Sequence, residues 1–387
     1  MGNEKILSLE IKKEVTNALG IFANGTEKQA NMVIQYNAIP HFLDLLSSDK
    51  EELQRAAILA FMGIMGHGPK FRDYCIKSGL VEPLINLVED SESSIDVLYD
   101  CAVMMYYICQ EGKPIVPHET VVKILPALKT LIELKSGNEK IDGILISAIG
   151  SLGFIEKSGF NRIRLIVEKN FVEKIVPFLQ HPHSDVQKMT IFALNKIMDG
   201  NSTYHQHVLD RDVLKNLHIL LSHSSDDDII KEALEFLIHV IAPNNTHIND
   251  VFKEQNLMPL VIKAFDIKKL QIQITATEVI LVTSVRGTIE QIEYLIENGI
   301  AAAICKHMKV LRFESFEGSE ENVLNALLHI VKKGKEKLTI MFNELEKCGG
   351  IDILEELKKS NDFNIRFMSG NIVNAILSAV TKNHMEL

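Results

Sequence analysis

The chain has 387 residues, of which 46% are hydrophobic, and a formal net charge of −10. This acidic balance argues against sequence-independent nucleic-acid binding, which needs a cationic face, and is compatible with basic protein partners. No uncharged apolar run reaches the roughly 18 residues of a membrane span, and the N-terminus lacks the apolar core of a secretory signal.

The five cysteines form no Cys-x-x-Cys pair. Scattered cysteines of odd number are typical of reduced thiols in an intracellular protein. We therefore expect the chain in the cytoplasm and the nucleus, in contact with neither membrane nor nucleic acid.

A short sequence motif with a proline near the start of an apolar helical pattern recurs along the chain. Pro40, Pro83 and Pro126 lie 43 residues apart, and the motif returns at Pro177 and Pro259. Apolar residues follow each proline at i+3 and i+4 spacing, which indicates a helix. Proline is tolerated just inside a helix start, where its missing N–H would be unbonded anyway. We therefore expect each of these prolines near the start of a helix.

Each of these helices is followed by a polar break, a longer helix and a short returning helix. Long helices are predicted over residues 11–23, 52–65, 95–109, 141–152, 185–198, 228–241, 271–285 and 321–331. Short helices are predicted over residues 28–35, 69–77, 163–168, 203–209, 246–254, 289–297 and 337–346. An insert, GKPIVPHETVV, precedes the Pro126 helix, and polar connections are expected at 313–319 and 332–337.

Three helices in about 43 residues are typical of the armadillo repeat. We predict an all-α, right-handed armadillo solenoid of about eight three-helix repeats, with the long helices lining a concave surface. It forms one domain over residues 1–387, with short tails at 1–9 and 381–387.

Several irregular phrases match a known family in order. They are GHGPKFRDYCIKSGLVEPL, ICQEGKPIVPHETVVKILPALKTLI, RGTIEQIEYLIENGI and EKLTIMFNELEKCGGIDILEELKKS. Over residues 10–380 the chain resembles importin-α (karyopherin-α), the armadillo adaptor that carries proteins with basic nuclear localisation signals. The resemblance implies binding of basic peptide segments of cargo proteins in a concave groove, as part of nuclear protein import.

Two features of the family lack a counterpart. Family members begin with an Arg/Lys-rich segment that binds importin-β, whereas the first residues here offer only Lys5, Lys12 and Lys13. Recruitment of importin-β is therefore doubtful. The family's long helices also carry Trp-x-x-x-Asn, whose indole rings hold lysine side chains and whose amides bond the peptide backbone. This chain has no tryptophan.

Flanking matches map the family's Trp and Asn places onto this sequence. The mapped pairs are Asn17 and Ile21, Leu59 and Gly63, Val103 and Tyr107, Ser147 and Ser151, Phe192 and Lys196, Glu235 and His239, and Glu278 and Val282, with His329 at one further Asn place. Of the acidic positions, Glu232 is kept, and Glu111 lies near the insert. Losing several cation–π contacts and amide hydrogen bonds costs on the order of 4 kcal/mol. We therefore expect weakened or altered recognition of basic signals.

The replacements leave two interpretations open. Glu232, Glu235 and Glu278 could hold lysines by charge, although Glu235 and Glu278 could instead be solvated charges. Tyr107 and Phe192 could offer aromatic faces, although Tyr106 and Tyr107 could instead be core or half-buried residues. An alternative function is a diverged armadillo scaffold that binds another protein ligand without import activity.

The sequence offers no set of residues for catalysis. His181, His183, His205 and His207 have spacings that suit a metal on a strand, but they fall in a break and in a short helix. No Ser/His/Asp or Cys/His set is placed by the pattern, so we expect neither an enzyme nor a cofactor.

Overall fold

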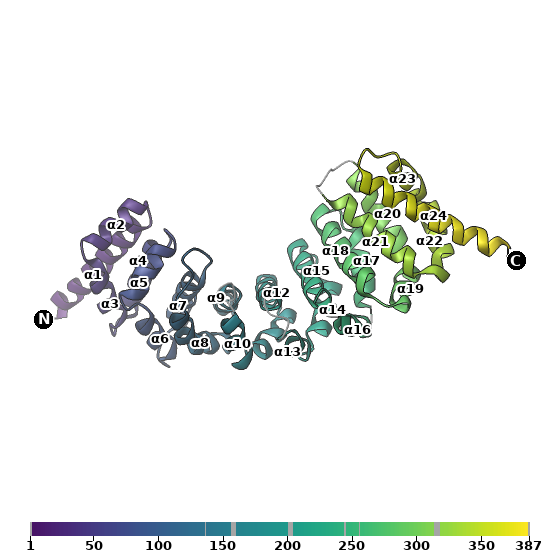
Figure 1. Ribbon diagram of the computed structural model, residues 1–387. Coiled ribbons are helices and arrows are strands. Elements are labelled where there is room, and N and C mark those ends of the chain that lie inside the picture. Colours follow the sequence, from purple (N-terminus) through teal and green to yellow (C-terminus); the bar gives the residue numbers. More distant parts are fainter. Residues whose placement is uncertain are drawn as a thin grey trace. The chain divides into compact units, whose positions relative to one another are not determined.

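The computed structural model describes residues 2–135, 137–155, 160–199, 204–243, 245–254, 256–312 and 318–385. All regular structure in these ranges is helical, which confirms the all-α prediction. The chain forms two compact units, residues 1–211 and residues 212–387, described separately below as unit 1 and unit 2 (Figure 1). Among the described helices, none combines the length and the hydropathy that a membrane span requires.

Unit 1 repeats a group of three helices: a short first helix, a second helix and a long third helix. It opens with a third helix, α1 (Gly2–Ala23). Two full groups follow, α2 (Glu27–Gln35), α3 (Ala38–Leu46) and α4 (Glu51–Met65), then α5 (Pro69–Lys77), α6 (Val81–Glu89) and α7 (Ile95–Cys109). The next group has α8 (His118–Ile132) and α9 (Glu139–Ile155), with residues 110–117 in place of a first helix. The unit ends with α10 (Phe160–Glu168), α11 (Phe171–Ile175), the 3-10 helix η2 (Val176–Gln180), α12 (Ser184–Asp199) and α13 (His205–Leu209).

Unit 2 continues the same plan, and its third helices are α15, α18, α21 and α24. Its elements are α14 (Val213–His223), α15 (Asp227–Ile241), α16 (Asn245–Lys253), α17 (Leu257–Lys263), η4 (Ala264–Asp266), α18 (Leu270–Arg286), α19 (Ile289–Glu297), α20 (Ile300–Leu311), α21 (Ser319–Lys333), η5 (Lys335–Lys337), α22 (Leu338–Cys348), α23 (Gly350–Leu357) and α24 (Phe363–Met385). The predicted polar connection at 332–337 is partly wrong, because α21 runs to Lys333; residues 313–317 lie outside the described residues.

The helix α24 was not predicted. Its polar residues and Gly370 interrupt the apolar spacing, yet Ile372, Val373 and Ile376 are buried against α21, α22 and α23. Both terminal helices also extend over residues that the pattern assigned to tails, since α1 begins at Gly2 and α24 ends at Met385.

The recurring prolines behave as predicted in some groups only. Pro40, Pro83 and Pro259 are each the third residue of a helix, α3, α6 and α17. Pro177 instead follows α11, inside η2. Pro126 lies in the interior of α8, so the prediction of a helix start there is wrong. The helix tolerates it because Val122, whose carbonyl loses its helical hydrogen bond, lies on the exposed side, where water can replace that bond.

A left-handed residue marks the turn from the first helix to the second helix of a group. Asn37, Asn170 and Asn256 adopt φ values of 58°, 60° and 72° there, and Gly79, Gly299 and Gly349 occupy the equivalent turns. Asparagine and glycine tolerate this conformation best. The turn therefore has a sequence signature that is independent of the proline.

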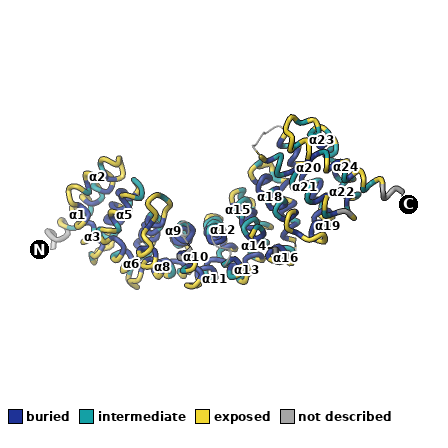
Figure 2. The backbone as a smooth tube through the Cα atoms, viewed as in Figure 1, coloured by how far each residue is buried: buried dark blue, intermediate teal, exposed yellow. Residues whose placement is uncertain are grey.

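Each third helix packs on the next third helix along each unit. In unit 1 the order is α1, α4, α7, α9 and α12, and in unit 2 it is α15, α18, α21 and α24. Buried residues run through the helix groups, while exposed residues gather at the connections (Figure 2). A single group could not bury its faces alone, so the core depends on this stacking.

The closest backbone approach that we find in this stack joins α1 and α4. A Cβ atom on Gly63 would lie 2.6 Å from the Gly20 carbonyl oxygen, and one on Gly20 would lie 2.9 Å from the Ala60 Cα atom. Gly63 occupies a mapped Asn place, so this position cannot offer a side chain to a ligand without moving the backbone.

We predict that Gly63→Ala destabilises unit 1 by about 1–3 kcal/mol, because the added methyl group overpacks a backbone contact. Hydrogen exchange of the α1 and α4 amides, resolved by mass spectrometry, should accelerate. Gly370→Ala is the control, since a Cβ atom there meets nothing within 4 Å, and it should stabilise α24 by about 0.5–1 kcal/mol. Unchanged exchange in Gly63→Ala would contradict the close packing.

Candidate functional site

The mapped residues lie on one side of the third helices, which we call the third-helix face. Spacing of i and i+4 places the two members of each pair on the same side, one turn apart. Ile21 on α1 and Leu59 on α4 are 77% and 49% exposed. The half-buried members are Asn17, Val103, Tyr107, Phe192, Glu232, Glu235, His239, Glu278 and Val282. Glu111 is exposed just after α7, and Gly63 is buried.

The mapped positions on α9 are not accessible to a ligand. Ser147 and Ser151 are buried, and their hydroxyls donate to the carbonyls of Gly143 and Ser147 within the same helix. They therefore offer no free donor to a peptide backbone.

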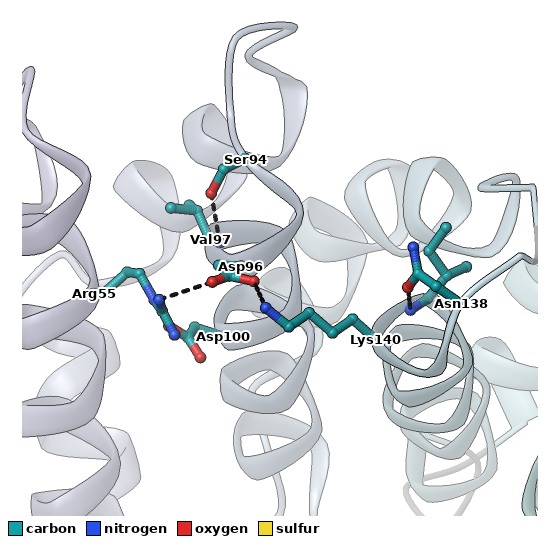
Figure 3. A network of polar contacts seen from close by, with 8 residues as sticks. Arg55, Ser94, Asp96, Val97, Asp100, Asn138 and Lys140 are labelled. Atoms are coloured by element: carbon teal, nitrogen blue, oxygen red, sulfur yellow. Dashed lines mark hydrogen bonds and ion pairs between the residues drawn. The ribbon is translucent and has the colours of Figure 1, made fainter.

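A charged network crosses the third-helix face of unit 1 one turn before the mapped positions. Arg55 on α4 donates from Nε to Asp100 Oδ2 at 2.7 Å and from Nη1 to Asp96 Oδ2 at 3.0 Å. Lys140 on α9 contacts the other oxygen of Asp96, so that α7 is joined to both neighbouring helices (Figure 3). Two cations meet two carboxylates in these contacts, and the exposed Glu51 on α4 adds a negative charge that acts through space on both Arg55 and Asp100.

Burial has the largest effect on the pKa of Asp100 in this network. Asp100 is 5% exposed, and burial raises the pKa of its carboxyl in spite of the hydrogen bond from Arg55. The hydrogen bond to Asp100 raises the pKa of the Arg55 guanidinium, and the hydrogen bond from Lys140 lowers the pKa of Asp96. Asp100 thus depends on Arg55 for compensation of a charge that water barely reaches.

An equivalent ion pair precedes this network in the stack. Lys13 on α1 donates to Glu52 on α4 at 3.0 Å. Lys13 and Arg55 each lie four residues before a mapped Trp place, and Glu52 and Asp96 each lie seven residues before one. The pairing therefore repeats in register from one third helix to the next.

Aromatic rings form a second line across unit 1. Tyr106, Phe154 and Phe192 come from α7, α9 and α12, with centroids 5.2 Å and 5.5 Å apart and edge-on geometry. The ammonium nitrogen of Lys196 lies 5.4 Å from the Phe192 centroid. The ring that was expected to offer a face to a ligand therefore already has a cation from its own helix.

The insert after α7 borders a cavity of about 340 Å³ lined by Cys109, Glu111, Gly112, Lys113, Ile115 and Phe154 among others. Two buried arginines hold the backbone of this insert. Arg72 donates to the carbonyls of Gln110 and Pro114, and Arg162 donates to the carbonyl of Val116. Glu111 therefore sits on a fixed loop rather than on a helix.

The third-helix face of unit 2 carries an open carboxylate. Lys231 contacts Glu235 one turn away on α15. Glu278 on α18 is half-buried and receives neither a hydrogen bond nor an ion pair from the part of the chain that the structure describes. Burial raises the pKa of Glu278, and the neighbouring Glu235 raises it further. Lys231, Glu235 and Glu278 together leave one negative charge.

The predicted residues therefore separate into two groups. Glu235 and Glu278 come together on α15 and α18, whereas Asn17, Leu59 and Val103 line unit 1 without a charge of their own. The mapping missed Arg55, Asp96, Asp100, Lys140 and Lys231. The available signal was their spacing, since Arg55 and Lys231 each precede a mapped residue by one helical turn.

The chain was compared with known proteins. A model described as an armadillo/beta-catenin-like repeat matches residues 26–61. The chain is 27% identical to importin subunit alpha-1a of Oryza sativa subsp. japonica over 252 residues, 65% of this chain and 47% of that protein. It is 27% identical to importin subunit alpha-4 of Arabidopsis thaliana over 296 residues, 76% of this chain and 54% of that protein. The chain thus spans about half the length of these curated relatives.

Solved structures share the fold. An engineered protein gives a TM-score of 0.65 at 19% identity, covering 94% of this chain and 95% of that chain. A designed armadillo repeat protein in complex with the peptide (KR)4 gives a TM-score of 0.53 at 21% identity, covering 65% of this chain and 99% of that chain. Together with the ordered three-helix repeats, these matches confirm the armadillo-repeat fold. The relatives above show that the chain is distantly similar in sequence to importin-α, as a diverged, importin-α-like protein.

Proposed function

We propose that this chain is an importin-α-like adaptor in nuclear protein import, acting in the cytoplasm and the nucleus. It binds basic peptide segments of cargo proteins on the third-helix face, with weakened and altered specificity. The observation that carries the proposal is the open carboxylate of Glu278, half-buried beside Glu235 on the face where the resemblance places peptide binding.

The chemistry of this position suits a lysine or arginine side chain. A half-buried carboxylate without a cation is destabilised by its own desolvation, and an incoming ammonium or guanidinium group relieves that penalty. Glu235 adds a second negative charge, because Lys231 neutralises only one of the two. A basic side chain is therefore attracted to α15 and α18 more strongly than to a neutral surface.

The remaining contacts are expected to be weak. The positions that would hold a peptide backbone carry His239 on α15 and Val282 on α18, and a valine side chain offers no hydrogen bond. Peptide recognition then rests on side-chain charge more than on the backbone. The designed armadillo protein in complex with (KR)4 supports the capacity of this fold to hold a basic peptide.

A second candidate function is an armadillo scaffold for a different protein ligand, without import activity. The network of Arg55, Asp96, Asp100 and Lys140 favours it, because its two carboxylates are already paired with cations of the chain itself and are not free to hold a basic peptide. The two candidates differ in whether a lysine-rich peptide binds at physiological salt.

Binding of a fluorescein-labelled (KR)4 peptide, followed by fluorescence anisotropy, tests the proposal. Glu278→Gln should weaken the binding about fivefold, which corresponds to about 1 kcal/mol for one ion pair near the surface. Glu346→Gln is the matched control, because Glu346 is exposed on the first helix α22 and the change in net charge is the same. Equal losses in the two variants would point to nonspecific charge attraction and would contradict a site at Glu278.

The raised pKa of Glu278 predicts a pH dependence of opposite sign for stability and for binding. Because the folded-state pKa lies above its ordinary value of 4.5, the ionised carboxylate destabilises unit 2 at neutral pH. Glu278→Gln should therefore melt at a higher temperature than the wild type at pH 7, and the difference should shrink as the pH falls toward 4.5. The advantage of the wild type in binding (KR)4 should shrink over the same range. A melting difference that grows on acidification would contradict the assignment.

A further inference from the structure

In unit 1, Arg55 and Lys140 already occupy the positions beside Asp96 and Asp100 where the cationic groups of a basic ligand would bind. Arg55 donates two hydrogen bonds to Asp96 and Asp100, and Lys140 contacts Asp96 from the opposite side (Figure 3). Arg55 lies one turn before Leu59 on α4, so this network belongs to the third-helix face rather than to the core. Both carboxylates of this network, Asp96 and Asp100, are thus already paired with a cation of the chain itself.

The aromatic part of the same face shows the same arrangement. Lys196, which occupies a mapped Asn place, extends its ammonium group toward the ring of Phe192 at 5.4 Å from the centroid. A ligand lysine that stacked on Phe192 would first have to displace Lys196. Asp96 and Asp100 on the one hand, and the Phe192 ring on the other, are therefore each already in contact with a cation of the chain itself.

A basic ligand would gain little binding free energy by displacing Arg55 from these carboxylates. A peptide lysine that replaced Arg55 would exchange one cation–carboxylate pair for another. The peptide would also lose translational and rotational entropy on binding. Asp100 is 5% exposed and bonded to the rigid guanidinium fork, so a flexible ammonium is a poorer match for it. In unit 2, by contrast, Glu278 has no hydrogen-bond or ion-pair partner among the described residues, and Lys231, whose charge acts on it through space, is paired with Glu235.

We propose that Arg55, supported by Lys140, is a built-in occupant of the acidic site formed by Asp96 and Asp100, and that it directs basic peptides away from unit 1 and toward unit 2. This inference rests on the proposed function and adds the residue that sets where the peptide binds. Its consequence is a latent cation site in unit 1. Removal of the guanidinium leaves a buried carboxylate uncompensated, and any cation that fits should then be bound.

The test uses the full chain in a background in which unit 2 is silenced by Glu235→Gln and Glu278→Gln. In this background, Arg55→Ala should bind labelled (KR)4 about tenfold tighter than the parent. Because burial raises the pKa of Asp100, the assay is repeated at increasing pH, and the gain in affinity should grow as the carboxyl ionises. Arg55→Ala combined with Asp100→Asn is the matched control, because it removes the same guanidinium together with the charge that binds the ligand, and it should show no gain.

Chemical rescue gives a second readout that needs no peptide. Millimolar ethylguanidinium chloride should raise the melting temperature of Arg55→Ala, but not that of the wild type or of the Arg55→Ala/Asp100→Asn variant. If Arg55→Ala does not fold, Arg55→Gln carries the same test with a smaller gain, because its amide can still donate to Asp100. The inference is overturned if Arg55→Ala gains neither peptide affinity nor rescue, or if the control gains equally.

These outcomes are separable from failure of the proposed function. A wild type that does not bind (KR)4, with an Arg55→Ala variant that does, would overturn peptide binding at Glu278 and support the latent site. If the wild type binds through Glu278 and the Arg55→Ala variant gains no affinity, peptide binding at Glu278 is supported and the latent site in unit 1 is overturned.

Discussion

Stacking of each third helix on the next is the contact on which both units depend. A single group of three helices has two apolar sides and cannot bury both, so its stability comes from its neighbours. The approach of Gly63 to the Gly20 carbonyl shows how tightly α4 is held against α1. The third-helix face lies between these contacts, where residues are only half-buried and the core does not fix their identity. A face of this kind can exchange tryptophan and asparagine for other residues while the fold persists.

Charge distinguishes the two parts of this face. In unit 1, Arg55 and Lys140 neutralise Asp96 and Asp100, and Lys196 covers Phe192. In unit 2, Glu278 remains open beside Glu235. The third-helix face thus has carboxylates that are paired with cations of the chain in unit 1, and a carboxylate without an ion-pair partner among the described residues in unit 2. Under the proposed function, the place where a basic peptide binds depends on which carboxylates already have an internal cation, rather than on the fold.

The sequence predicted most of the fold, because the fold is a local pattern repeated. The bounds of α5 and α19 were predicted to the residue, and in the structure Pro69 opens α5 and Thr288 caps α19. The helix α24 was missed because its apolar spacing is interrupted and its stability comes from α21, α22 and α23. Pro126 was misplaced because a proline is compatible with a helix interior when the orphaned carbonyl faces water. The site was harder to predict, since the network of Arg55 joins residues 41 and 45 positions apart that no local pattern relates.

We propose that a basic peptide binds to α15 and α18 and not to α4 and α7. A (KR)4 peptide in which one lysine is replaced by a photoreactive lysine analogue tests it directly, with crosslinked positions mapped by mass spectrometry. The account predicts crosslinks on α15 and α18 around Glu235 and Glu278 in the wild-type chain. Crosslinks confined to α4 and α7, with Arg55 intact, would contradict it.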